Sequence, residues 1–132
     1  DRWMRGTDPT ATNVDVCNKI GTYRKAPAAF DNDVPFYVAL PGPTIDWQMN
    51  DGVKSIPIEQ RDATEITHVT GKNSTGQVES VQITPDGVSA CNSAFDVTPA
   101  RLVTGLFTER GVCDASEAGL LGLYPEQEGQ IT

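Results

Sequence analysis

The sequence predicts an α+β fold, in which one antiparallel sheet of five or six short strands carries two short C-terminal helices packed on one face. Short runs of alternating apolar and polar residues recur over residues 34–91, which is the periodicity of half-buried strands. Turn residues separate these runs, and the two helices with capping signals both follow the last strand. Strands followed by helices along the chain are typical of α+β domains.

The chain before residue 34 shows little periodicity. Residues 1–12 are polar and rich in threonine, so we expect an extended arm or linker that Trp3 can hold in place. Residues 13–23 have both helical and strand-like spacing of their apolar residues, and a helical turn or two is the preferred interpretation. Residues 25–33 combine an Ala-Pro pair with Asp-Asn-Asp, which indicates a connection rather than an element.

The first strands are expected on either side of a turn that is rich in proline and glycine. Residues 34–40 form an apolar run, which Pro35 confines to a sheet edge or to the start of a strand. Residues 45–49 alternate strictly, and the Asn-Asp-Gly triplet after them predicts a hairpin turn into a strand at 53–58. Trp47 belongs to the apolar face of this strand, so we expect it in the core rather than as an aromatic platform for a sugar.

The second half of the chain predicts another hairpin and then the helices. Residues 64–70 are a strand candidate, and residues 79–84 and 88–91 flank a Pro-Asp-Gly turn. Thr98 is a good N-cap with proline after it, and apolar residues recur on one helical face until Gly111 ends the helix.

A further helix start follows closely. Residues 114–117 resemble a capping box, and they predict a second short helix that carries two leucines.

Length and charge define the domain and the partners that we expect. The 132 residues fit a single α+β domain over residues 13–124, followed by an acidic tail at 125–132. The net charge of −8 argues against binding to nucleic acid, and no apolar run approaches the roughly 20 residues of a membrane span. Because the chain begins with Asp1 rather than methionine, we expect that a preceding segment has been removed.

Three cysteines are the main candidates for chemistry. The preferred interpretation is a disulfide between Cys91 and Cys113, because the predicted helix between them can fold back toward the strand; Cys17 then stays free. The alternative is a nucleophile at Cys113, where the start of a helix lowers the pKa of a thiol, with His68 as its base. His68 is the sole histidine, and on a strand face we expect it to be structural.

The remaining motifs predict neither a metal site nor a cofactor. Asp31-Asn32-Asp33 lacks the spacing of an EF-hand loop. Within the sequence there is no glycine-rich phosphate loop, no nucleophile elbow and no Cys/His ligand set. The evidence for an enzyme is therefore weak, and the sequence favours a protein without catalytic activity.

The position of two cysteines suggests a resemblance. Cys91 and Cys113 bracket a segment near the C-terminus after a region of strands, which resembles the soluble head of pilin-type surface proteins. The long apolar N-terminal helix of that family is absent here. The resemblance implies a surface-fibre subunit.

The leading hypothesis is a non-enzymatic extracytoplasmic module with a structural or binding role: a surface-fibre subunit, an adhesin or a coat component. Such a protein is secreted or lies on a cell or virion surface, where disulfides persist. One alternative is a small thiol-dependent hydrolase or transferase that uses Cys113. Another is an acidic inhibitor or mimic that occupies a basic site on an enzyme.

A protein partner is expected at a sheet edge. Phe36, Tyr37 and Val38 follow Pro35, so their strand is predicted to present unpaired backbone groups. Either the N-terminal arm around Trp3 covers this edge, or a partner or sister subunit adds a strand there. The second arrangement is the preferred prediction.

Overall fold

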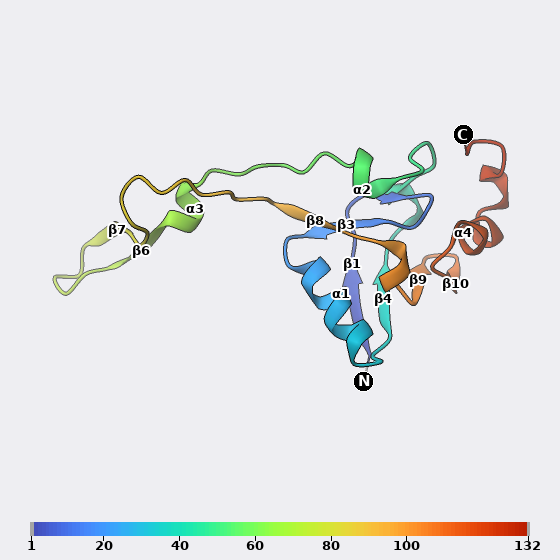
Figure 1. The fold of residues 1–132 in the computed structure, drawn as a ribbon, viewed down its shortest axis with the longest axis horizontal. Helices are drawn as coiled ribbons and strands as arrows, with labels where there is room; N and C mark the ends of the chain where they lie inside the picture. Colours follow the sequence, from blue (N-terminus) through green and yellow to red (C-terminus); the bar gives the residue numbers. More distant parts are fainter. Residues whose placement is uncertain (1, 132) are drawn as a thin grey trace. The chain divides into compact units, whose positions relative to one another are not determined.

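The computed structural model describes residues 2–131, which divide into two compact units (Figure 1). Unit 1 comprises the chain up to Pro57 and from Phe95 onward, and unit 2 is the segment Ile58–Ala94. The domain boundaries predicted at residues 12 and 124 stay a prediction. No helix within residues 2–131 has the length and apolar character to cross a membrane.

Unit 1 is built from two four-stranded sheets with helices beside them. Its strands are β1 (Trp3–Gly6), β2 (Thr10–Ala11), β3 (Val16–Lys19), β4 (Phe36–Ala39), β5 (Ile45–Asp46), β8 (Phe95–Thr98), β9 (Gly105–Thr108) and β10 (Gly111–Asp114). Its helices are α1 (Thr22–Asp31), α2 (Gly52–Ser55) and α4 (Glu117–Leu123), with 3-10 helices η1 (Gly42–Thr44), η2 (Ala100–Leu102) and η3 (Pro125–Gln127). Sheet A has the order β1-β4-β9-β10, and sheet B has the order β5-β2-β3-β8.

Sheet A contains parallel strands, which contradicts the predicted antiparallel sheet. Strand β4 pairs in parallel with both β1 and β9, and β10 returns antiparallel to β9. A parallel pair needs a long crossover, and α1 lies in the crossover from β1 to β4 and packs on β4. The strands are short apolar runs in either arrangement, so the periodicity that predicted them carried no information on their direction.

Strand β4 lies inside sheet A, so the predicted edge contact at Phe36, Tyr37 and Val38 was wrong. Strand β1 covers that side, and the N–H of Trp3 donates to the carbonyl of Pro35 at 3.0 Å. Phe36 and Val38 are buried, while Tyr37 is half-buried. The N-terminal arm therefore occupies the position that was expected for a partner.

The core of unit 1 lies where sheet A, sheet B and the helices meet. Strand β4 supplies Phe36 and Val38, β9 supplies Leu106, and α4 supplies Leu120, and all four are nearly inaccessible to solvent. Trp47 is half-buried and packs against this core. These contacts tie α4 to a sheet whose strands come from distant parts of the sequence.

The helix predicted from Thr98 to Gly111 is absent. Thr98 ends strand β8, where it is fully buried opposite Val16, and the chain continues through η2 into β9. Pairing across sheet B therefore overrides the local helix signal. The second predicted helix is confirmed as α4, since the Ser116 hydroxyl accepts the N–H of Gly119 at 3.0 Å as an N-cap.

Two turn signals were misread. Helix α1 occupies the predicted connection at residues 25–33, and it includes Pro27. Its Ala26 and Ala29 pack into the core, which compensates for the donor that proline lacks. The triplet before α2 makes no hairpin, because the Asp51 carboxylate instead caps α2 by accepting the N–H of Lys54 at 3.1 Å.

Unit 2 consists of α3 (Thr64–Thr67) and an antiparallel hairpin of β6 (His68–Lys72) and β7 (Val78–Gln82). The strand predicted at 64–70 thus begins as a helical turn, and residues 88–91 form no strand. The two ends of the unit are joined by the N–H of Ala94, which donates to the carbonyl of Glu59 at 2.9 Å. Ala94 is also the one buried residue of this unit.

Candidate functional site

The parallel strands of sheet A end at one edge, which is where ligands bind in α/β sheets. Strand β1 continues through Asp8 and Pro9 into β2, and β4 continues through η1 into β5. Strands β2 and β5 pair with each other in sheet B, as β1 and β4 do in sheet A. Both crossings between the sheets therefore lie side by side, and the surface between them is hollowed.

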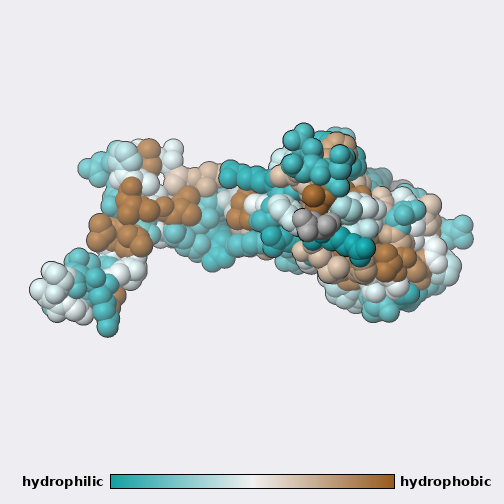
Figure 2. Space-filling view, turned by 90° about the horizontal axis from the view of Figure 1, so that it is seen from below, coloured by the Kyte–Doolittle hydropathy of each residue, from teal (hydrophilic) through white to brown (hydrophobic). Residues whose placement is uncertain are grey.

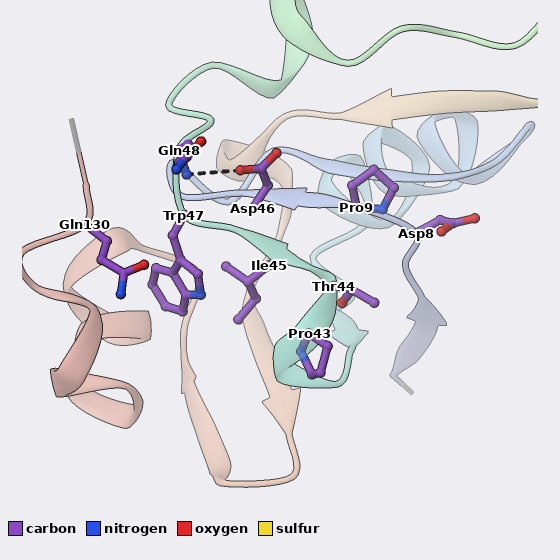
Figure 3. A pocket seen from close by; sticks show the side chains of 9 residues that line it. All are labelled: Asp8, Pro9, Pro43, Thr44, Ile45, Asp46, Trp47, Gln48 and Gln130. Carbon is purple, nitrogen blue, oxygen red and sulfur yellow. Dashed lines mark hydrogen bonds between the residues drawn. The ribbon is translucent and has the colours of Figure 1, made fainter.

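A cavity of about 560 Å³ lies at this junction (Figure 3). Asp8 and Asp46 bring exposed carboxylates to it, and Trp47 lies between Ile45 and Gln130 in this view. The Asp46 carboxylate accepts the backbone N–H of Gln48 at 3.0 Å, which holds it in place. The cavity is lined by Asp8, Pro9, Pro43, Thr44, Ile45, Asp46, Trp47, Gln48 and Gln130.

A hydrogen-bonded cluster of Gly42, Glu109 and Tyr124, named the lock below, lies beside this cavity and holds the loop after β4. The Glu109 carboxylate accepts the N–H of Gly42 at 2.8 Å and the hydroxyl of Tyr124 at 2.9 Å. Hydrogen bonds lower the pKa of Glu109, and the bond from the Gly42 N–H has the largest effect. Burial raises the pKa of Tyr124. The lock therefore joins the ends of β4 and β9 to the residue that follows α4.

Glycine is required at the centre of this lock. A Cβ atom at Gly42 would lie 2.7 Å from Glu109 Oε1 and 2.8 Å from Tyr124 Oη, which is closer than side chains approach. Arg110 covers the Tyr124 ring at 4.2 Å and pairs with Glu126 at 2.6 Å. These contacts hold Gly42 directly before Pro43, which lines the cavity.

The start of α1 lies toward the same end of sheet A. Helix α1 runs opposite to β4, so its first turn lies toward the end at which β4 finishes (Figure 1). The Asp96 carboxylate accepts the N–H groups of Gly21 at 2.6 Å and Tyr23 at 3.0 Å, and thereby caps the helix. Lys19 is exposed at the end of β3 and forms no ion pair within the part of the chain that the structure describes.

The predicted disulfide is wrong, because all three cysteines are free thiols. Cys91 is exposed in unit 2, where its Sγ donates to Gln60 Oε1 at 3.2 Å. Cys113 lies in strand β10 of unit 1, opposite Leu106. The helix that was expected to fold back between the two cysteines does not exist.

The predicted nucleophile has no activating environment. Cys113 lies in a strand rather than before a helix, and burial together with Asp114 raises the pKa of its thiol. His68 belongs to unit 2, where its Nδ1 bonds the Thr67 hydroxyl at 2.9 Å. Burial also raises the pKa of the Cys17 thiol to about 11.

The edge of sheet A escaped the sequence analysis because its residues come from three separate loops. Gly42, Glu109 and Tyr124 are far apart in the sequence and form no motif. The one local signal was the Pro-Gly-Pro run after β4, which was interpreted as a strand end. Because β4 is an inner parallel strand, the Pro-Gly-Pro run that follows it lies at the edge of the sheet where ligands bind.

The chain matches the model of the initiation factor 2 subunit family (IF-2B) over residues 4–115. It is 70% identical over 127 residues to a methylthioribose-1-phosphate isomerase of Rhodospirillum rubrum, covering 96% of this chain and 33% of the relative. It is 67% identical to the isomerase of Paramagnetospirillum magneticum, covering 96% of this chain and 35% of the relative. The chain thus spans about a third of the length of these curated relatives.

Solved structures agree with this match. The 5-methylthioribose 1-phosphate isomerase of Pyrococcus horikoshii OT3 superposes with a TM-score of 0.80 at 36% identity, covering 96% of this chain and 33% of that one. The delta subunit of translation initiation factor eIF-2B from A. fulgidus superposes with a TM-score of 0.77 at 34% identity, covering 95% of this chain and 34% of that one.

These findings contradict the function expected from the sequence. The near relatives are named as isomerases, so a non-enzymatic surface-fibre subunit, adhesin or coat component is wrong, and so is an extracytoplasmic location. The thiol-dependent hydrolase and the acidic mimic are contradicted by the same relatives. The resemblance to pilin heads rested on a pair of cysteines that are not bonded.

Proposed function

Because the chain belongs to the initiation factor 2 subunit family, we propose that it forms part of a methylthioribose-1-phosphate isomerase. The observation that supports this choice is the identity of 70% and 67% to two such isomerases, against 34% to the structure of an initiation factor subunit. The three free cysteines suit a reducing compartment, so we place the protein inside the cell.

The phosphate of such a substrate needs a cation that is not already neutralised. Arg110 is paired with Glu126, and the cavity at the junction of the sheets is lined by two carboxylates without Lys or Arg. Lys19 is exposed at the end of β3 in sheet B, just before the first turn of α1. We assign Lys19 to the phosphate.

An isomerase also needs a group that takes up a proton and returns it elsewhere. Carboxylates are suitable, and Asp8 and Asp46 line the cavity. Asp46 is held by the N–H of Gln48, which favours a fixed position, whereas Asp8 lies in the connection from β1 to β2. We propose that one of these two carboxylates contacts the sugar.

The test is turnover of methylthioribose 1-phosphate by the purified isomerase of which this chain is proposed to form part, with three variants in this chain. For Lys19→Gln we expect a KM raised at least tenfold, because the phosphate loses its cation. For Asp46→Asn or Asp8→Asn we expect a kcat lowered by about 100-fold or more, the usual contribution of a general acid–base. Lys54→Gln is the matched control, since Lys54 is exposed and pairs only with Asp51 beside it.

The outcomes test the isomerase activity and the assignment of its residues separately. Absence of turnover by the unaltered protein would refute the isomerase. Full turnover by all three variants would keep the isomerase and refute this assignment of its residues.

A sister subunit is the partner that we propose. The A. fulgidus relative is itself named as a subunit. The edge at β4 is covered within the chain, so such a contact must use another edge.

A further inference from the structure

Trp47 presents part of its indole ring to the cavity that Asp8 and Asp46 line. It is half-buried, whereas Ile45, whose side chain extends to the same side in Figure 3, is only 5% exposed. Among the described residues that line the cavity, Trp47 has the one aromatic side chain. It is therefore the largest apolar surface that a ligand in this cavity can contact.

The indole ring is held in place by its neighbours. Its centroid lies 5.6 Å from the centroid of the Tyr124 ring, with an angle of 59° between the two planes. Tyr124 is itself fixed, because its hydroxyl donates to Glu109 at 2.9 Å and Arg110 covers its ring. Little ordering of the indole is then needed when a ligand binds, and this lowers the cost of binding.

The proposed substrate has an apolar end that neither Lys19 nor the carboxylates can bind. In 5-methylthioribose 1-phosphate, the substrate named for the P. horikoshii relative, the phosphate and the methylthio group lie at opposite ends of the sugar. A thioether donates no hydrogen bond, and its burial against an apolar surface is favourable. Sulfur also makes favourable contacts with aromatic rings. The methylthio group therefore needs an aromatic or aliphatic wall away from the cation.

The order of strands in sheet B places such a wall on the required side. The order is β5-β2-β3-β8, so β2 lies between β5 and β3. Lys19 ends β3, Asp8 comes shortly before β2, and Trp47 directly follows β5. A substrate with its phosphate at Lys19 and its sugar at Asp8 consequently extends its methylthio group toward β5 and Trp47.

Unit 2 offers no comparable wall. Hydrophobic side chains reach its surface and are drawn in brown in Figure 2. A cavity of about 510 Å³ in this unit is nevertheless lined by polar or charged side chains: Thr64, Glu65, His68, Thr70 and Ser80. The combination of carboxylates with an aromatic wall is thus found at the junction of sheets A and B.

On the basis of the proposed isomerase function, we propose that Trp47 determines the substrate specificity, and that the methylthio group packs against its indole ring. Trp47 then contacts a part of the substrate that does not react, so it selects the substrate and takes no part in proton transfer. A hydroxyl in place of the methylthio group would lose its bonds to water against this ring. A single apolar group in a hydrophobic pocket changes specificity by about 10- to 200-fold.

The first test compares methylthioribose 1-phosphate with ribose 1-phosphate, in which a hydroxyl replaces the methylthio group. With the purified isomerase that contains this chain, ribose 1-phosphate is added as a competing ligand. We expect its inhibition constant to exceed the KM of methylthioribose 1-phosphate by about tenfold or more. Trp47→Ala should bring the two constants within about threefold of each other, because both ligands then lack the aromatic contact. A partly unfolded preparation leaves this ratio unchanged, since both constants refer to the folded fraction.

Two further variants show whether the aromatic ring is responsible. Trp47→Phe keeps an aromatic face and should retain most of the preference for the methylthio substrate. Phe30→Ala is the matched control, because Phe30 is an aromatic side chain that is 66% exposed in the last turn of α1 and does not line this cavity. It should leave the ratio of the two constants unchanged.

A longer thioether tests the same contact by size. Trp47→Ala leaves room for a longer alkyl chain, so kcat/KM for the n-butylthio analogue, relative to the methylthio substrate, should rise by about fivefold or more. A purely structural role of Trp47 would lower turnover of both substrates by the same factor.

The outcomes distinguish this inference from the proposed function on which it rests. If the unaltered isomerase turns over methylthioribose 1-phosphate and Trp47→Ala changes neither ratio, the specificity role of Trp47 is refuted and the isomerase function stands. Absence of turnover by the unaltered isomerase would refute the function, and the role of Trp47 with it.

Discussion

Units 1 and 2 both contain strands with alternating apolar residues, yet they use them in opposite ways. In unit 1, alternate residues such as Phe36 and Val38 are buried in a core that sheets and helices share. In unit 2, Val69 and Val81 lie opposite each other on one face of the hairpin and remain exposed. Alternation therefore identifies a strand with an apolar face, but only the tertiary structure shows what covers that face.

Because the two units differ in this way, they suit two different kinds of function. Unit 1 has rigid edges on which side chains from distant loops meet, as the lock of Gly42, Glu109 and Tyr124 shows. Such an edge suits a site for a small substrate. Unit 2 has a regular edge with free backbone groups, which suits pairing with another strand.

The largest expected effect comes from truncating one apolar residue in each unit. Phe36→Ala should lower the free energy of unfolding by about 3 to 5 kcal/mol, since it leaves a cavity in the core of unit 1. Val78→Ala in unit 2 should change it by less than about 0.5 kcal/mol, because Val78 is largely exposed. Urea unfolding measures both, and equal losses would contradict the contrast between the units.

The buried thiol of unit 1 predicts a loss of stability at high pH. Burial raises the pKa of Cys17 from 9.0 to about 11, so the folded state keeps the neutral thiol while the unfolded chain ionises. This contribution is complete below pH 9 and is lost as pH rises through 11; it amounts to roughly 2 to 3 kcal/mol at about 1.36 kcal/mol per pH unit. Thermal unfolding across this range should show the loss, and Cys17→Ala should lack it.

Two glycine substitutions sharpen the comparison. Gly42→Ala should cost about 1 to 3 kcal/mol, as an overpacked site does, because its Cβ meets Glu109 and Tyr124. Gly71→Ala in β6 of unit 2 places its Cβ in open space and should be close to neutral. A neutral Gly42→Ala, measured by the same unfolding assay, would show that the lock is not rigid.

The smallest effect is a difference in rate of thiol labelling without any change in stability. Cys91 is exposed in unit 2, whereas Cys17 is buried in unit 1, and Cys113 is intermediate. With a thiol reagent under native conditions, mass mapping should find label first at Cys91 and last at Cys17. Denaturation should remove the difference, and early labelling of Cys17 would mean that unit 1 opens locally.

The sequence by itself determined features that depend on neighbouring residues. A short apolar run identified the strand at β4, apolar alternation identified that at β7, and the capping pattern before Glu117 identified α4. The absence of a long apolar run was also evident from the sequence. Each of these is fixed by interactions within a few residues, so a short window of sequence is sufficient.

Tertiary structure alone decided which strands are neighbours and in which direction they run. Tyr37 pairs with Gly105, and Thr98 with Val16, across separations that local periodicity does not encode. In place of the helix predicted from Thr98 to Gly111, these pairings give η2 and strand β9. They also place β4 in the interior of its sheet rather than at the edge, and they bring the residues of the candidate site to one edge. The physical reason is that a strand gains most of its stability from the partner and core that it meets, and these lie far away in the chain.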